Sequence, residues 1–269
     1  MRTAVLSFLL VIHLPILATG GEKGTYDFLR LDFGARPSAL YGSFVSMTDD
    51  PNMVFYNPAS LPTLTRTFAS AGFLKHLLDI HAGSLSFGYA IPDVGTLGLG
   101  VAFVDYGSFE HTDASMNILG TLGGQDLALV GGMGVFLDEF TSVGMSLKFI
   151  YSSLAGYRST AAAADIGVLY VIPSENITIG ASVRNLGTQI SAYIDTREPL
   201  PLDVTVGITK RPEHLPVFLN LNFHKLNESQ GSLLDRFSAF TFGAEFLMSE
   251  SLRLRLGYSN EKRKELKLG

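Results

Sequence analysis

The sequence predicts an all-β fold: a transmembrane antiparallel β-barrel with an N-terminal segment folded inside its lumen. Three features of the 269-residue chain support this prediction. The first is an apolar leader of the kind that directs export, and the second is an alternation of large apolar residues with small or polar ones. The third is a rhythm of short and long connections between the alternating runs.

The composition limits the classes to which the chain can belong. Charged residues make up 17% and hydrophobic residues 46%, which is low in charge and high in apolar content for a soluble domain. The formal net charge of -5 gives no sign of nucleic-acid binding. There is no cysteine, so disulfides, thiol catalysis and thiolate metal sites are excluded.

Residues 1–20, MRTAVLSFLLVIHLPILATG, are predicted to be a cleaved secretory signal. Arg2 supplies the positive end, and Ala18-Thr19-Gly20 offers small residues at the cleavage positions. An uncleaved membrane anchor is the alternative. His13 and Pro15 disfavour it because they interrupt an already short apolar run. The chain is therefore expected to work outside the cytoplasm.

From residue 67 onward the chain alternates with a period of two, which places successive side chains on opposite faces of a strand. In TLGLGVAFVDY, for example, Leu97, Leu99 and Val101 alternate with Gly98 and Gly100. One face of each run is large and apolar and the other is small or polar, as in a strand that crosses a bilayer. Eleven such runs are predicted, at about residues 67–74, 81–91, 95–105, 125–136, 141–152, 161–172, 176–186, 202–210, 216–224, 236–248 and 251–259.

The connections distinguish a barrel from a β-sandwich, in which strands also alternate. After the even-numbered runs they are short (PDV, DEF, PSE, RPEH and SES), and after most odd-numbered runs they are longer, as in GSFEHTDASMNILGTLGG. Short turns at one end and long loops at the other are typical of outer-membrane barrels. Two features depart from this pattern. The connection KHLLD is short for an outer loop, and eleven is an odd number of strands, so the closing strands are expected to be missing from this sequence.

A compact, punctuated segment precedes the first run. Its stretch TDDPNMVFYNPASL, residues 48–61, is neither an alternating strand nor a good helix. Its elements Gly34-Ala35-Arg36, Ala39-Leu40, Gly42, Asp49-Asp50 and Asn57-Pro58-Ala59 resemble the N-terminal signature of the PorV/PorQ family. The downstream stretches FVDYGSFEHTD, LKFIYSSLAGYRS and RNLGTQISAY resemble its PorQ branch. Tyr41 departs from the family pattern, which usually has a glycine there.

The resemblance implies an outer-membrane barrel of the type IX secretion system with a FadL-like fold of fourteen strands, about eleven of them present here. Residues 21–66 would form a plug inside the lumen and residues 67–269 the barrel. An N-terminal linker with ordinary turns is the alternative to a plug. The candidate plug residues, with a structural or gating role, are Arg36, Asp49, Asp50, Asn57, Pro58 and Ala59.

Two of these residues carry specific expectations. Pro58 suits a turn, or a helix that begins after Asn57. Arg36 is expected to pair with an acid in the lumen, and the acids on the small faces of the strands are Asp126, Asp165, Asp203 and Glu245.

Glycines are frequent on the small face of the runs. They leave room inside the barrel for a plug or a ligand, or they ease strand curvature and barrel closure. Both explanations are kept for Gly88, Gly98, Gly100, Gly132, Gly134, Gly144, Gly167, Gly180, Gly207 and Gly243.

No catalytic site, cofactor or metal is predicted. Two groups of possible metal ligands lie in loops without further ligands and are better explained as solvated loops: His76, Asp79 and His81, and Glu110, His111 and Asp113. The sequence has no nucleophile elbow, zinc-protease motif or phosphate loop, so an enzyme is not expected.

The outer loops, about residues 106–124, 153–160, 187–201 and 225–235, are the predicted partner-binding surface. Candidate residues on them are Tyr106, Phe109, His111, Tyr157, Arg158 and Tyr193. Aromatic residues near the outer strand ends also fit an interfacial girdle, for which the candidates are Tyr106, Phe109, Tyr151, Tyr157, Tyr193 and Tyr258.

The main functional prediction is a non-enzymatic outer-membrane component of type IX secretion, in contact with the membrane lipid and without a nucleic-acid partner. The resemblance implies that it anchors a PorZ-like surface protein in the complex that attaches cargo to the cell surface, with PorU- or PorV-like subunits as further partners. A FadL-like transporter of hydrophobic small molecules is the alternative, and a soluble secreted β-rich domain is the third hypothesis.

Overall fold

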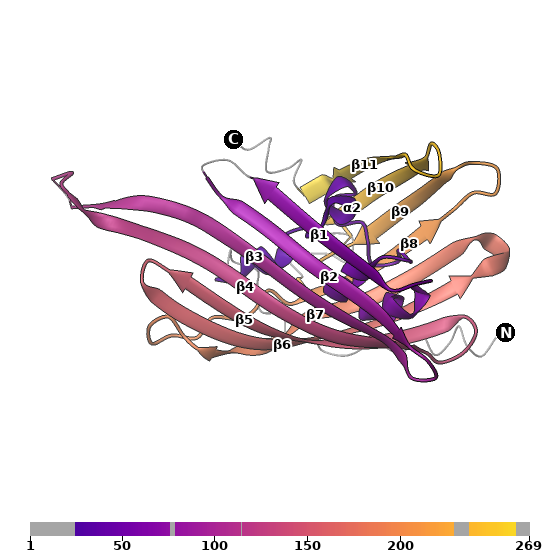
Figure 1. Cartoon of the computed structure of the whole chain (residues 1–269), viewed down its shortest axis with the longest axis horizontal. Helices are drawn as coiled ribbons and strands as arrows, with labels where there is room; N and C mark the ends of the chain where they lie inside the picture. Colours follow the sequence, from indigo (N-terminus) through magenta and orange to yellow (C-terminus); the bar gives the residue numbers. More distant parts are fainter. Residues whose placement is uncertain (1–24, 76–78, 114, 229–236, 262–269) are drawn as a thin grey trace.

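The computed structural model describes residues 25–75, 79–113, 115–228 and 237–261, and it is an all-β chain (Figure 1). The eleven described strands form one antiparallel sheet in which each strand pairs with the next along the chain, from β1 to β11. The predicted all-β, barrel-type architecture is thereby confirmed. The predicted signal, residues 1–20, lies outside the described residues.

The strands begin and end close to the predicted runs, with some exceptions at one end of the sheet. Their bounds are β1 Phe68–Lys75, β2 His81–Ile91, β3 Gly95–Thr112, β4 Ile118–Phe136, β5 Thr141–Leu154, β6 Tyr157–Ile172, β7 Ile177–Ser191, β8 Asp203–Lys210, β9 Val217–Phe223, β10 Phe240–Leu247 and β11 Arg253–Ser259. The turns β2–β3, β4–β5, β6–β7, β8–β9 and β10–β11 lie at what we call the short-turn end, and the opposite end is the outer end.

Two of the predicted outer loops are largely strand. Most of the predicted loop 106–124 belongs to the long β3–β4 hairpin, and the predicted loop 153–160 contains only a tight turn between β5 and β6. The prediction of loops there was wrong because these strand ends do not keep the large-small alternation that marks the rest of each strand. The β7–β8 connection is a real loop, although β7 continues to Ser191.

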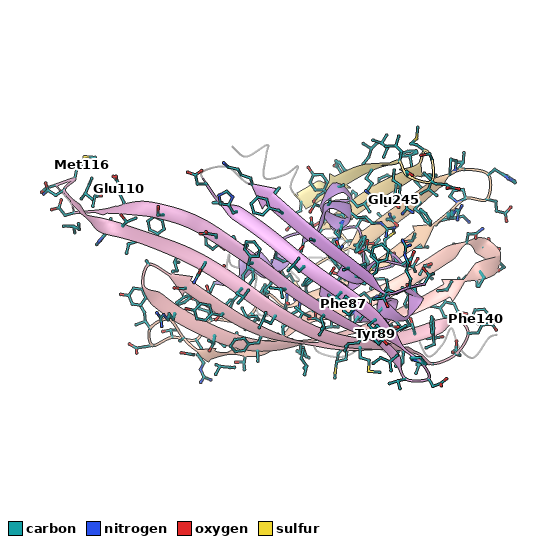
Figure 2. All side chains as sticks on the ribbon, viewed as in Figure 1. Phe87, Tyr89, Glu110, Met116, Phe140 and Glu245 are labelled. Atoms are coloured by element: carbon teal, nitrogen blue, oxygen red, sulfur yellow. The ribbon has the colours of Figure 1, made fainter. Side chains whose placement is uncertain are left out.

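The sheet is inverted in polarity relative to a soluble protein. Large apolar side chains point outward, and Leu85, Leu147 and Leu254 are 58%, 61% and 52% exposed. Polar side chains point inward, and Ser146 and Glu245 are 1% and 0% exposed. A continuous apolar outer surface is favourable in contact with lipid and unfavourable in water. The sheet therefore has the faces of a transmembrane barrel. Figure 2 shows this outward layer, with Phe87 and Tyr89 labelled on β2.

The N-terminal segment occupies the concave side of the sheet. Its short helices are η2 (Asp27–Arg30), α2 (Ala35–Ala39), η3 (Pro51–Phe55) and η4 (Pro58–Thr63), and a further 3-10 turn, η5 (Pro173–Glu175), lies at the short-turn end of the barrel wall. The hydrophobic core of the molecule sits between this segment and the sheet. We call described residues 25–66 the plug. Within the described residues, no helix is long and apolar enough to cross a membrane.

The plug also lies beside both end strands of the sheet. Among the described residues β1 pairs with β2 and β11 with β10, and these two end strands do not pair with each other. A methyl group placed at Gly72 of β1 would lie 3.1 Å from Gly34 Cα, and one at Gly257 of β11 would lie 2.7 Å from the Leu40 carbonyl carbon. The segment around α2 therefore spans from one end strand to the other (Figure 1).

Candidate functional site

The predicted Asn57-Pro58-Ala59 element lies against β4, β5 and β6 near the short-turn end. Asn57 is the N-cap of η4, with its side-chain oxygen accepting from Ala59 N at 3.1 Å and Pro58 at the first helical position. Asn57 Nδ2 donates to Val45 O at 2.8 Å and to Val168 O on β6 at 3.2 Å. One amide thus joins two parts of the plug to the barrel wall.

Two acids fix the loop that precedes this element. Asp50 is the N-cap of η3 and accepts from Asn52 N at 2.9 Å. Asp49 adopts a positive φ of 55°, which aspartate tolerates better than most side chains. Its carboxylate accepts from the backbone N–H and the hydroxyl of Thr65, at 3.2 and 3.1 Å. The predicted pair Asp49-Asp50 therefore shapes the plug from within.

Arg36 pairs with two of the acids around it. Its Nε lies 2.8 Å from Glu245 Oε2 on β10, and its Nη1 lies 3.2 Å from Asp50 Oδ2. Arg253 and Arg255 of β11 contact the same Glu245 carboxylate at 3.3 and 2.6 Å. We call Arg36, Asp50, Glu245, Arg253 and Arg255 the latch, since it joins the plug to the last two strands.

The inward glycines meet the plug at most positions. A methyl group at Gly144 would lie 2.3 Å from the Pro58 carbonyl carbon, and one at Gly167 would lie 1.9 Å from Asn57 Oδ1. Gly132 is different, because its neighbour would be Ser146 on the adjacent strand. Close approach of the plug thus explains most of these glycines. Those facing plug atoms are Gly88, Gly98, Gly100, Gly134, Gly144, Gly167, Gly180, Gly207 and Gly243.

Replacing Asn57 with alanine should loosen the plug. The change leaves two buried carbonyls and one N–H without their partner, and each lost hydrogen bond of this kind costs about 1 kcal/mol or more. We expect hydrogen exchange of the backbone amides of residues 44–60 to accelerate by about a hundredfold. Asn117→Ala, in an exposed turn, is the control and should leave those amides unchanged. Equal exchange rates in both variants would contradict the role given to Asn57.

A small cavity lies between the plug and the wall. It has about 10 Å³ of space for the centre of a water molecule, which is room for about one water. Polar and apolar atoms share its surface about equally, and eight of its ten lining residues have hydrophobic or aromatic side chains: Leu29, Leu31, Phe33, Phe55 and Tyr56 from the plug, and Ala102, Ala128, Val130, Lys148 and Arg184 from the sheet.

Both cations are paired with buried acids. Lys148 Nζ lies 2.8 Å from Asp165 Oδ2 and 2.8 Å from Asn185 Oδ1. Arg184 pairs with Asp203 on the neighbouring strand. These pairs compensate charges that would be costly to leave unpaired in the lumen.

Neither cation was among the predicted site residues. Each is a positively charged residue on the small face of a strand, and an acidic residue lies on the small face of the neighbouring strand. This pairing of opposite charges could have identified them. That comparison requires the strand register, in which Lys148 is opposite Ala163 and Arg184 is opposite Asp203.

The β7–β8 loop, residues 192–202, lies at the outer end of the sheet, and we call it the outer lid. Tyr193 of the lid donates to Ser152 on β5, and Leu200 is buried in the core. Glu198 N donates to Gln189 Oε1 at 2.8 Å, and Asn185 Nδ2 donates to Pro201 O at 3.0 Å. These contacts hold the lid against the inward side of β5 and β7.

The predicted outer-surface residues divide into two groups. Tyr106 donates to Asp126 at 2.7 Å and Tyr193 to Ser152, so both hydroxyls face the lumen. Their assignment to the aromatic girdle was wrong, because hydroxyl groups at these positions find buried acceptors inside the barrel. Phe109, His111, Tyr157 and Arg158 are exposed.

The described residues of the two histidine groups, which we predicted not to bind metal, lie in loops and at strand ends. His76 lies outside the described residues. In the part of the chain that is described, no group of three or more His, Cys, Asp or Glu side chains is arranged to hold a metal ion.

Comparison with known proteins finds similarity among solved structures. No family model matches the chain. No curated protein matches it either. Among solved structures it is similar to the Pseudomonas putida toluene transporter TodX, with a TM-score of 0.54 and 14% sequence identity, over 84% of this chain and 83% of that one. The chain therefore has the fold of a FadL-like barrel, the fold that the sequence predicted.

Proposed function

We propose that this chain is an outer-membrane channel for small, largely apolar molecules, and that its plug is the gate. The apolar outer surface supports a location in a membrane, and the predicted signal supports the outer membrane. The fold is shared with a protein whose structure is that of a toluene transporter. Binding and gating require no chemistry by this chain.

The observation that carries the proposal is the cavity between the plug and the wall. On the wall side Ala102 and Ala128 are small and leave space, while on the plug side Phe33 and Phe55 fill that space. The two rings lie against each other with centroids 5.8 Å apart. A ligand larger than water does not fit this space, so its entry requires the plug or the lining side chains to move.

The chemistry of the lining indicates the class of ligand. Eight of the ten lining residues have hydrophobic or aromatic side chains, and the two cations are paired with Asp165 and Asp203. Burying an apolar ligand there is favourable by about 25 cal/mol per Å² of its surface. An uncharged aromatic or aliphatic molecule therefore fits better than a multiply charged one.

Photolabelling with a phenyl-diazirine, competed by toluene, tests this function in the purified detergent-solubilised protein. We expect labelled residues to include Phe33 or Phe55, and Ala128→Leu to reduce that labelling about tenfold because overpacking costs about 1–3 kcal/mol. Ala162→Leu is the matched control, since Ala162 is exposed on the outer face of β6. Labelling confined to outward-facing residues, or insensitivity to Ala128→Leu, would refute a lumen site.

Anchoring of a surface protein is the second candidate function. The PorV/PorQ resemblance implies it, with a PorZ-like protein and other type IX secretion components as partners, and these assignments remain predictions. The observation that favours an outer partner is the length of the β3–β4 hairpin, which extends beyond the neighbouring strands (Figure 1).

A further inference from the structure

The outer part of the β3–β4 hairpin, described residues 106–113 and 115–123, forms a two-stranded ribbon that we call the distal ribbon. Pairing of β2 with β3 ends at His81 opposite Asp105, and pairing of β5 with β4 ends at Leu154 opposite Gly124. Within the described residues the distal ribbon therefore has no strand beside it on either side. In Figure 2 its labelled residues Glu110 and Met116 lie far from the rest of the sheet.

The distal ribbon lacks two of the residue types that normally protect a free strand edge, lysine and proline, although β3 has bulges between Asp105 and Ser108 and between His111 and Thr112. Exposed edges usually carry lysine or proline, or are covered by another element. The sequence from residue 106 to residue 123 contains no lysine, arginine or proline. A two-stranded hairpin is also only marginally stable in water, so a third strand would add both backbone hydrogen bonds and side-chain packing.

Its apolar side chains are exposed on both faces. Met116, Ile118 and Leu119 are 85%, 63% and 60% exposed. Phe109 is 44% exposed and lies opposite Leu122. Leu122 is an even number of residues from the inward-facing Asp126, so by the strand alternation this pair lies on the lumen side of the sheet. The outward-apolar pattern of the membrane-spanning part is thus lost here, which separates this surface from the lipid-facing one.

The charge of the distal ribbon is negative. It carries Glu110 and Asp113, while His111 is its one residue with a basic side chain. The Asn117 side chain and backbone N–H groups hold the pKa of the Asp113 carboxyl below its ordinary value, which keeps it ionised at neutral pH. An acidic surface is repelled by anionic lipid head groups and attracts basic side chains.

We propose that the distal ribbon captures a partner protein by strand addition, pairing one of its free edges with an extended segment rich in apolar and basic residues. Backbone hydrogen bonds along the edge supply affinity, and alternate side chains of the added strand supply specificity. This proposal rests on the second candidate function, the anchoring of a surface protein, and is independent of transport through the lumen.

Hydrogen exchange of the full-length protein in detergent tests the proposal with three synthetic probes. The first is a ten-residue peptide of alternating lysine and valine, the second is the same peptide N-methylated at every residue, and the third alternates glutamate and valine. We expect the first peptide to slow exchange of the amides of residues 108–122 about tenfold. The N-methylated peptide keeps the side chains but has no N–H to donate, and the glutamate peptide carries the wrong charge, so neither should slow exchange.

Two variants distinguish strand addition from other contacts. Glu110→Lys should weaken protection by the lysine peptide, while Glu139→Lys, in an exposed turn at the short-turn end, should not. Unchanged exchange with the lysine peptide, or equal protection by its N-methylated form, would overturn the proposal. In a parallel measurement without peptide, protection of the same amides by anionic phospholipid vesicles would also overturn it. Photolabelling of the cavity is a separate measurement, so its failure would not be confused with failure of this one.

Discussion

Replacing Gly144 with valine should expel the plug from the short-turn end of the lumen while the barrel stays folded. A side chain at this position would place its Cβ 2.3 Å from the Pro58 carbonyl carbon and 2.5 Å from Ala59 N. These are backbone atoms, so no rotamer change relieves the contact. Pro58 and Ala59 are also fixed by Ser142, whose hydroxyl donates to Ala59 O at 2.6 Å. The overpacking should cost the plugged state about 3 kcal/mol.

The absence of cysteine from the chain makes this change measurable. Ser60 is fully buried in the plug, so a single cysteine introduced by Ser60→Cys should react with a maleimide only when the plug opens. We expect Gly144→Val to raise the labelling rate about a hundredfold, the factor that corresponds to a change of about 3 kcal/mol in the opening free energy. Retained resistance to heat in detergent gels would show that the barrel remains intact.

Gly131→Val is the matched control. Gly131 is an exposed position on the outward face of β4, where the nearest atom to an added Cβ is Leu99 Cδ2 at 3.8 Å. The cysteine at position 60 should react no faster in this variant than in the parent. If Gly144→Val also left the reaction rate unchanged, Pro58 and Ala59 would not be held against β5 as described.

The sequence predicted the barrel wall well because lipid and lumen impose opposite demands on alternate residues. Leu85 and Ser86 illustrate this, since the first is 58% exposed and the second 4%. The distal ribbon was predicted as a loop because neither of those demands acts there. Both of its faces are exposed, and a bulge between Asp105 and Ser108 shifts the alternation, so the two-residue period disappears.

The plug was less accessible to prediction. The capping roles of Asp50 and Asn57 follow from local sequence, because an Asp or Asn before proline at a helix start is a local signal. The partner of Arg36 does not follow from it. Four acids were candidates, and the choice of Glu245 depends on where α2 lies along β10 and β11. Such a contact, between residues 209 positions apart, is determined by the packing of the whole plug.

Tyr41 occupies a backbone conformation that glycine adopts most easily. Its backbone has a φ of 51°, in the left-handed region that glycine adopts most easily, and Gly42 follows with a φ of 68°. The conformation is therefore the one that a glycine pair would favour, and the tyrosine side chain is 41% exposed. The chain retains the turn there at a cost of about 1–2 kcal/mol in backbone strain.

Removing the carboxylate of Glu245 should release the latch. Its side chain is fully buried and receives hydrogen bonds from Arg36, Arg253 and Arg255. In Glu245→Ala the three guanidinium groups lose their shared carboxylate. Arg36 keeps Asp50 at 3.2 Å and Thr48 O at 3.4 Å, while Arg253 and Arg255, whose side chains are 45% and 25% exposed, keep only partial solvation in its place. Breaking a buried ion pair from one side costs about 3–5 kcal/mol. We expect a cysteine introduced by Ser43→Cys, at a fully buried position, to react with maleimide at least about a hundredfold faster.

A second substitution separates charge imbalance from the loss of packing. Arg36→Ala removes one of the cations that lose the Glu245 carboxylate, so the double variant Glu245→Ala with Arg36→Ala should label more slowly than Glu245→Ala alone. Glu245→Gln keeps an acceptor but loses the charge, and its labelling rate should lie between those of the parent and the alanine variant. The labelling rates of the two single variants give two free-energy changes for opening of the plug. If the change in the double variant equalled their sum, Arg36 and Glu245 would not act as a pair. The plug would then be held at this end by packing against Gly243 and Gly257 alone, where added methyl groups would meet Leu40 at 3.1 and 2.7 Å.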